Sequence, residues 1–188
     1  RRAVAAVLST NSQLSLLQCT ASYPTPAEEV NLRVIDTLRR EFPELVIGLS
    51  DHYNGIAMSV VAYVMGARIV EKHFTMNHTW KGTDHAMSLQ PIGMMKMVRD
   101  LQRARMAMGD GVKRVLPSEE SALTKMGKSI VAARDLPAGH ALAPSDLTFK
   151  SPGGGLPPYM VDRVIGRRLA RALDADDLLM AEDVEQAA

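Results

Sequence analysis

The residues of this sequence best suited to chemistry are two histidines that lie at the ends of consecutive apolar runs. His52 follows the run at residues 45–49, and His73 lies near the end of the run at residues 68–74. Each run has the length of a buried strand, so the 21 residues between the histidines correspond to one strand–helix repeat. Adjacent parallel strands lie only about 4.8 Å apart, so both imidazoles can converge on one ion or ligand.

We predict that His52 and His73 bind a divalent metal. A single histidine at either position would be interpreted as a hydrogen-bonded residue of the core or rim, but two at equivalent strand ends favour a metal. Imidazole suits a borderline divalent ion, and a site completed by water and substrate oxygens suits Mn²⁺ or Mg²⁺ better than structural Zn²⁺. The single Cys19 excludes an internal disulfide and a Cys-based zinc site.

Four further side chains follow or lie near the same strand ends. Asp84 is either a turn residue or a carboxylate at the mouth of the site, where it would bind substrate and take a catalytic role. Tyr23 and Ser50 could each be ordinary capping residues, but together they are expected to hydrogen-bond a ligand. Glu71 shares one side of its strand with His73, so it is a candidate to orient a metal-binding imidazole.

The elements that would position these residues follow the strand–helix rhythm of a parallel sheet covered by helices. The predicted strands cover residues 14–19, 45–49 and 68–74, and two of the predicted helices cover residues 56–65 and 91–108. Thr25-Pro26-Ala27-Glu28 has the form of a capping box and predicts the start of an earlier helix. A complete (β/α)₈ barrel takes about 250 residues, so these 188 residues can hold only part of one.

The strand–helix rhythm ends near residue 110, and residues 111–124 are expected to be a linker. The predicted domains are therefore residues 1–110 and residues 125–188. The second domain has short β segments interrupted by Pro and Gly, and a faint internal repeat. A shift of 37 residues aligns residues 133–138 with 170–175, Leu142 with Leu179, and Asp146 with Asp183. This pattern predicts two copies of one small β unit.

The amino-acid composition argues against several classes of binding partner. The net charge is +1, from 22 basic and 21 acidic residues that are mixed along the chain, so neither nucleic acid nor an anionic membrane is an expected partner. Aromatic residues make up only 4%, too few for a base-stacking platform. No stretch approaches the roughly 18 apolar residues of a membrane helix. We expect a soluble, cytoplasmic protein, and a small anionic ligand is compatible with these features.

The sequence resembles the sialic acid synthase family, whose members condense phosphoenolpyruvate with N-acetylmannosamine or a related sugar. The motifs that carry the resemblance are Leu-Gln-Cys-Thr-Ala-Ser-Tyr-Pro-Thr-Pro (17–26), Val-Asn-Leu-Arg (30–33), Ile-Gly-Leu-Ser-Asp-His (47–52), Glu-Lys-His-Phe-Thr (71–75) and Thr-Trp-Lys-Gly-Thr-Asp-His (79–85). Residues 127–133 and 135–139 resemble the start of the antifreeze-like domain of these enzymes. Several motifs in the right order, covering nearly the whole chain, make the resemblance specific.

The resemblance implies an α/β fold built from the C-terminal part of a (β/α)₈ TIM barrel, with its sixth to eighth strands, and a small β-rich antifreeze-like (SAF, β-clip) domain. It implies that His52 and His73 bind Mn²⁺ or Mg²⁺, that Ser50 contacts phosphoenolpyruvate, and that Tyr23 and Asp84 contact the sugar or order water near it. In the implied reaction the metal polarises the sugar aldehyde, the enol carbon attacks it, and phosphate leaves by carbon–oxygen cleavage. The implied assembly is a domain-swapped homodimer.

Two positions depart from the family pattern. Ala21 stands where many bacterial members have Asn, and Ser151 stands where the family has an Arg that reaches the sugar in the partner subunit's site. These changes bear more on which sugar is used than on the reaction. Members also draw phosphoenolpyruvate-binding lysines and a sugar-binding glutamate from the first five strands. We expect the isolated chain to lack synthase activity because it does not include those residues. We also expect it to be unstable or aggregated, because three of eight strands cannot close a barrel and leave two open sheet edges.

Three alternatives remain open at the level of sequence. A related enzyme could make legionaminic or pseudaminic acid with the same chemistry, or could act on a sugar 6-phosphate. A reading from a different class is a non-catalytic module that binds a carbohydrate through residues 125–188. Sugar binding without metal would favour the module, because the enzyme reading depends on the metal.

Overall fold

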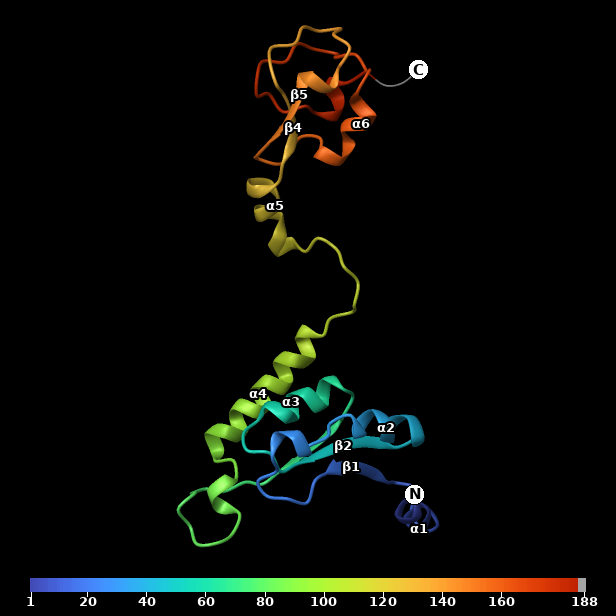
Figure 1. The fold of residues 1–188 in the computed structure, drawn as a ribbon, viewed down its shortest axis with the longest axis vertical. Coiled ribbons are helices and arrows are strands. Elements are labelled where there is room, and N and C mark those ends of the chain that lie inside the picture. Colours follow the sequence, from blue (N-terminus) through green and yellow to red (C-terminus); the bar gives the residue numbers. More distant parts are fainter. Residues whose placement is uncertain (186–188) are drawn as a thin grey trace. The chain divides into compact units, whose positions relative to one another are not determined.

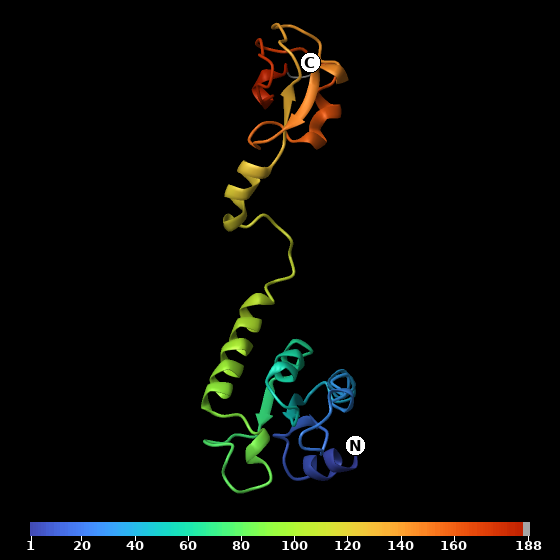
Figure 2. The same cartoon turned by 60° about the vertical axis from the view of Figure 1, so that its left-hand side comes forward.

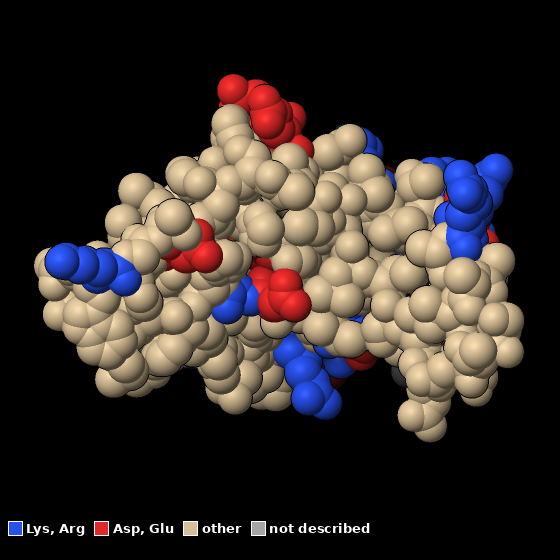
Figure 3. Space-filling model, turned by 90° about the horizontal axis from the view of Figure 1, so that it is seen from below, with Lys and Arg blue, Asp and Glu red and all other residues tan. Residues whose placement is uncertain are grey.

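The computed structural model describes residues 1–185, which divide between Val112 and Lys113 into two compact units. Each unit has its own buried cluster of apolar side chains. Within the described residues, no helix is long and apolar enough to cross a membrane. On the face drawn in Figure 3, basic and acidic side chains are interspersed among uncharged ones, so this face carries no extended patch of one sign.

The first unit alternates strands and helices, as the apolar runs predicted (Figure 1). Its elements are α1 (Arg2–Leu8), β1 (Ser15–Cys19), α2 (Val34–Glu41), β2 (Val46–Asp51), α3 (Ala57–Val64), β3 (Ile69–Lys72) and α4 (Pro91–Ala107). The three strands form one sheet in the order β1-β2-β3, and both neighbouring pairs are parallel. The prediction of an α/β unit is therefore confirmed.

The core of this unit lies between the sheet and the helices that pack on β2. Ile35 of α2, Leu49 of β2 and Ala62 of α3 are each at most 1% exposed. α2 and α3 both contact β2, and α4 lies along α3 (Figures 1 and 2). β2 is thus the central strand, buried from Ile47 to its last residue, Asp51. Burial on this scale fixes which side chains of β2 face the helices and which face the other side of the sheet.

Strand register brings the polar strand ends to one edge of the sheet. Cys19 pairs with Ser50 and Ser50 with Glu71, so these three positions lie side by side across the sheet. One step further, Asp51 pairs with Lys72. His52 and His73 come two residues after Ser50 and Glu71. Because side chains alternate along a strand, each histidine is expected on the same face of the sheet as that earlier residue. The sheet therefore sets both histidines at the same height.

The first predicted helix starts later than its sequence signal. Ala27–Glu29 forms only a 3₁₀ turn, and α2 begins at Val34. Thr25 does not cap a helix, because its hydroxyl donates to the carbonyl of Ser22 at 2.7 Å. Asn31 has φ 47°, a left-handed conformation that interrupts a helix. The capping-box signal at Thr25 was therefore misleading, and the chain turns twice before α2.

The segment between β3 and α4 returns to the end of β3. The backbone N–H of Leu89 donates to the carbonyl of His73, and the N–H of Thr75 donates to the carbonyl of Leu89, both at 2.9 Å. These bonds form a short parallel bridge between Phe74 and Leu89. The polar loop at residues 76–88 is therefore closed at its base and is held beside His73.

The second unit is a small β-rich body. Its elements are α5 (Glu120–Met126), β4 (Ser129–Ala132), β5 (Leu147–Lys150) and α6 (Val161–Val164). β4 and β5 are antiparallel, and four single bridges, among them Leu136 with Leu173, connect the irregular segments around them. Its core contains Ile130, Leu136, Leu142, Leu169, Leu173 and Leu179, each at most 2% exposed. Part of the expected linker thus forms α5.

The internal repeat is confirmed by matching contacts in the two copies. Arg134 binds Asp146 at 2.7 Å, and Arg171 binds Asp183 at 2.5 Å, 37 residues later. Each aspartate also accepts a backbone N–H from the residue three positions before it, at 2.9 and 2.8 Å. The copies face each other through Leu136 and Leu173, whose peptide groups exchange two hydrogen bonds. Two equivalent halves thus build the unit around one shared core.

Candidate metal and substrate site

Three aromatic rings from three separate segments meet beyond the carboxyl ends of the strands. The ring centroids of His52 and His73 lie 5.0 Å apart, with planes at 89°. Tyr23, which follows β1, stacks on His73 at 4.1 Å and meets His52 edge-on at 5.6 Å. Ligands of parallel α/β sheets bind at this end of the strands. The three residues predicted from their positions after separate strands therefore form one cluster.

Ser50 and Glu71 lie beneath this cluster on adjacent strands. The hydroxyl of Ser50 donates to Oε1 of Glu71 at 2.6 Å, and this hydroxyl oxygen of Ser50 lies 3.5 Å from Nε2 of His52. The thiol of Cys19 lies 3.9 Å from the same imidazole nitrogen. Glu71 thus reaches His52 through Ser50 and does not hydrogen-bond it directly. Both predicted residues lie with the histidines.

Asp84 enters from the loop at residues 76–88. Its Oδ2 lies 3.7 Å from Nδ1 of His73, and its side chain is 55% exposed. A cavity of about 330 Å³ opens beside it, lined by His73, Phe74, Gly82, Thr83, Asp84, His85 and Ser88. An exposed carboxylate at the rim of such a cavity can accept hydrogen bonds from ligand hydroxyls. Asp84 joins the cluster from outside the sheet.

The donor atoms around the cluster fit a divalent ion in part. Nδ1 of His52 is buried without a hydrogen-bond partner, and in the tautomer protonated at Nε2 its lone pair is available to a cation. Two imidazoles and a nearby carboxylate are donors that Mn²⁺ and Mg²⁺ accept when water or substrate oxygens fill the other positions. Among residues 1–185, however, no three His, Cys, Asp or Glu side chains form a group ready to hold a metal. Any metal bound here would need additional ligands.

Ser88 connects two parts of the site that the sequence analysis treated separately. Its hydroxyl donates to the carbonyl of Asp84 at 2.7 Å and lies 3.3 Å from the hydroxyl of Tyr23. The carbonyl of Ser88 lies 2.7 Å from Nε2 of His78. Ser88 is only 5% exposed although its neighbours in the loop are mostly exposed. A serine in a polar loop carries no sequence signal of this role, because the contact to Tyr23 spans 65 residues.

A network across the opposite face of the sheet was also missed. Asp51 and Lys72 form an ion pair of 3.2 Å with side chains 0% and 2% exposed. Neither residue was predicted from the sequence to take part in the site. The signal that could have revealed them is their alternation with the histidines, because each immediately precedes one of the two.

Of the two positions that depart from the family pattern, Ser151 has its described contact within the second unit. The hydroxyl of Ser151 lies 3.5 Å from the carbonyl of Met126. Its neighbour Lys150 forms an ion pair with Asp176, within the second unit. Ala21 is exposed and has no polar side chain to offer. The described contacts of Lys150 thus hold it inside its own unit.

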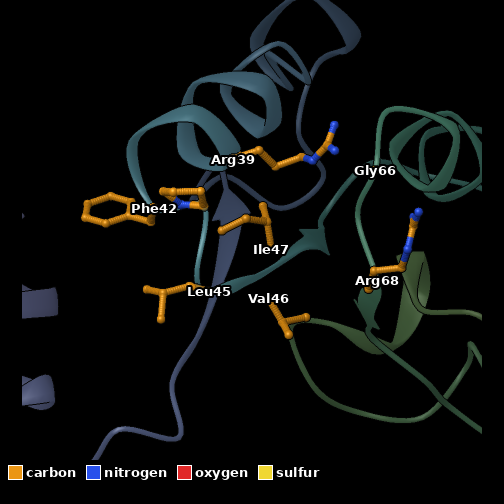
Figure 4. Close-up of a pocket in the computed structure, with 8 residues that line it drawn as sticks. Arg39, Phe42, Leu45, Val46, Ile47, Gly66 and Arg68 are labelled. Atoms are coloured by element: carbon orange, nitrogen blue, oxygen red, sulfur yellow. The ribbon is translucent and has the colours of Figure 1, made fainter.

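A second cavity, of about 380 Å³, lies at the amino ends of β2 and β3 (Figure 4). Two of its lining residues are arginines that bind the carbonyl end of α3. Arg39 points toward Gly66 and donates to the carbonyl of Met65 at 3.0 Å, and Arg68 donates to that of Tyr63 in α3 at 3.3 Å. Cations at the carboxyl end of a helix stabilise it. The arginines of this cavity therefore act in the fold, at the opposite end of the strands from the histidines.

These features define an α/β protein with a candidate metal and substrate site at the carboxyl ends of its strands, joined to a small β unit built from two repeats. The chain belongs to the NeuB family, which matches residues 1–113. Residues 127–185 match the SAF domain. The similarity to sialic acid synthases inferred from the sequence motifs is therefore confirmed.

Similar proteins of known name are synthases of this family. N-acetylneuraminate-9-phosphate synthase of Mus musculus is 40% identical over 176 residues, which are 93% of this chain and 49% of that protein. N,N'-diacetyllegionaminic acid synthase of Campylobacter jejuni is 34% identical, over 88% of this chain and 49% of that protein. The chain thus spans about half the length of the curated relatives it matches.

A crystal structure of N-acetylneuraminic acid (sialic acid) synthetase from Leptospira borgpetersenii, in complex with citrate, is also similar. It is 35% identical, with a TM-score of 0.56 over 65% of this chain and 42% of that one. The similarity therefore extends from sequence motifs to the fold.

Proposed function

We propose that this chain is the metal- and sugar-binding part of a sialic acid synthase, which condenses phosphoenolpyruvate with N-acetylmannosamine to N-acetylneuraminate and phosphate. The observation that carries the proposal is the meeting of Tyr23, His52 and His73 in one ring cluster with Asp84 beside it. The names of the similar proteins support the same class of reaction. In this proposal β1, β2 and β3 are the last strands of a (β/α)₈ barrel, and the enzyme works as a domain-swapped homodimer.

His52 and His73 would hold Mn²⁺ or Mg²⁺, and the ion would polarise the aldehyde of the open-chain sugar. The remaining site residues bind and orient. Asp84 accepts hydrogen bonds from sugar hydroxyls, and its Oδ2 lies 3.7 Å from Nδ1 of His73. The hydroxyl of Tyr23 is held near Ser88 and can bind the same sugar.

Ser50 carries one hydroxyl proton, which it donates to Glu71 in this structure. To bind an anionic oxygen of phosphoenolpyruvate, Ser50 rotates this proton away from the carboxylate. Because a carboxylate only accepts hydrogen bonds, this rotation breaks the bond between Ser50 and Glu71. The bond to Glu71 is therefore a cost of binding phosphoenolpyruvate through Ser50, because the hydroxyl has one proton to donate.

The experiment that tests the proposal uses the protein expressed from its complete gene, since the chain spans about half of its relatives. Phosphate release from phosphoenolpyruvate is measured with N-acetylmannosamine in the presence of Mn²⁺. We expect turnover by the wild type and its loss in His52→Ala and His73→Ala. His140→Gln, a histidine bound to Asp146 in the second unit, serves as the control and should remain active. Absence of turnover with every acceptor sugar would contradict the proposal.

The same assay identifies the acceptor sugar when it is repeated with N-acetylmannosamine 6-phosphate and with the precursors of legionaminic and pseudaminic acid. The similar mouse enzyme is named for a 9-phosphate product, which favours including the phosphorylated sugar. Sugar binding without metal and without turnover would instead support the carbohydrate-binding module. These outcomes separate the sugars and the two classes of function.

A further inference from the structure

We propose that Asp51 and Lys72 are positioning residues that set the relative placement of His52 and His73 from the opposite face of the sheet. The proposal rests on the proposed function, because it assigns the pair a purpose toward a bound metal. Asp51 and Lys72 are register partners on β2 and β3, and each immediately precedes one histidine. Their side chains leave the sheet on the helix side, whereas those of Ser50 and Glu71 leave it on the histidine side.

The pair holds the backbone of Tyr53, the residue that follows His52. Oδ1 of Asp51 accepts the backbone N–H of Tyr53 at 3.0 Å, and the ammonium of Lys72 donates to the carbonyl of Tyr53. His52 lies between Asp51, whose carboxylate makes the first of these bonds, and Tyr53, which takes part in both. Its own carbonyl accepts the N–H of Thr25 at 3.0 Å, which ties it to the segment that carries Tyr23. The histidine backbone therefore has little freedom to move relative to β3.

The same network reaches α3. The hydroxyl of Ser59, which is fully buried, donates to Oδ2 of Asp51 at 2.6 Å. Asp51 thus binds the ammonium of Lys72, a helix hydroxyl and a loop peptide, and these contacts leave it 1% exposed. A carboxylate with this set of donors has one conformation, so it transmits the position of α3 to the end of β2.

Stability alone does not explain an ion pair in this place. The side chains of Lys72 and Asp51 are 2% and 0% exposed, so both charges are removed from water. Replacing a buried pair by apolar side chains of similar volume is often neutral or stabilising, because desolvation costs about as much as the attraction returns. An ion pair at this position is better explained by the geometry it imposes. That geometry is the register of β2 and β3 at their carboxyl ends, where each strand is followed by an imidazole proposed to bind the metal.

The test measures binding of Mn²⁺ by electron paramagnetic resonance in the protein from its complete gene. We expect Lys72→Met to weaken Mn²⁺ binding by about 10–100-fold, the range typical of residues that orient metal ligands. Lys72→Arg keeps the charge and the donors and should restore most of the affinity. Lys96→Met, at an exposed lysine of α4, is the matched control and should bind as the wild type does.

The double variant Asp51→Asn/Lys72→Met covers the case in which the single variant does not fold, because it leaves no unpaired buried charge. We expect it to fold and still to bind Mn²⁺ weakly. Wild-type affinity in the folded double variant would overturn the proposal, since the pair would then be structural only.

A second measurement does not depend on metal. The ¹⁵N chemical shifts of the His52 and His73 side chains, recorded without metal, should move in Lys72→Met and return in Lys72→Arg. If the wild type binds no Mn²⁺ but these shifts move, the proposed function fails while the positioning role stands. If Mn²⁺ binds and neither affinity nor shifts respond to the variants, the positioning role fails while the proposed function stands.

Discussion

The phenol ring of Tyr23 lies on the imidazole of His73, with ring centroids 4.1 Å apart and planes 18° from parallel. The two residues follow strands that are not neighbours, since β2 lies between β1 and β3. The contact therefore exists only when all three strand ends are in register. It also covers one face of an imidazole predicted to bind a metal and sets the tyrosine hydroxyl 3.3 Å from Ser88.

Tyr23→Phe separates these two roles. The variant keeps the ring on His73 and loses only the hydroxyl, so Mn²⁺ affinity should be unchanged. KM for the acceptor sugar should rise about 3–10-fold, the effect of losing one neutral hydrogen bond. Steady-state kinetics and Mn²⁺ titration measure the two effects. Tyr159→Phe, at a tyrosine 83% exposed in the second unit, is the control. Equal KM values for both variants would show that the Tyr23 hydroxyl does not bind the sugar.

Gly48→Ala should destabilise the first unit because β3 passes too close for a side chain. A Cβ at Gly48 would lie 2.6 Å from the carbonyl oxygen of Ile69 and 2.9 Å from its Cβ. We expect a loss of about 1–3 kcal/mol in the free energy of unfolding, measured by urea denaturation. Gly93→Ala in α4 meets only the flexible end of Leu89 at 3.2 Å and should change stability by no more than about 1 kcal/mol. Equal effects at the two glycines would contradict the packing argument.

The histidine cluster could be anticipated from sequence because it depends on strand ends, and these are marked by apolar runs of the right length. His52 and His73 needed only the rule that parallel strands end at one edge. Ser88 could not be anticipated, since its role depends on where a loop of polar residues returns. The helix start predicted at Thr25 was wrong for a similar reason: its hydroxyl donates to the carbonyl of Ser22 and does not cap a helix. Local signals thus predict strands better than they predict the path of connecting loops.

Asp146 should make the stability of the second unit depend on acid pH. The N–H of Ala143, with His140 and Arg134, lowers the pKa of this carboxyl from 3.8 to about 2. Because the folded pKa is the lower one, the carboxylate stabilises the fold above about pH 4 and loses this effect as pH falls toward 2. Asp146→Asn should cost about 2 kcal/mol at pH 6 and progressively less below pH 4. Thermal unfolding from pH 6 to pH 2 measures it, and a constant difference between wild type and variant would contradict it.

The two halves of the second unit should contribute equally to its stability. Leu136 and Leu173 occupy equivalent places in the repeat, are 2% and 1% exposed, and bind each other through their peptide groups. Leu136→Ala and Leu173→Ala should therefore each cost about 3–5 kcal/mol, as expected for truncation in a packed core. Leu123→Ala, at a leucine 50% exposed in α5, should cost far less. Chemical denaturation measures all three. Because both leucines belong to the same buried cluster, a large difference between the two core variants would show that the halves are not equivalent.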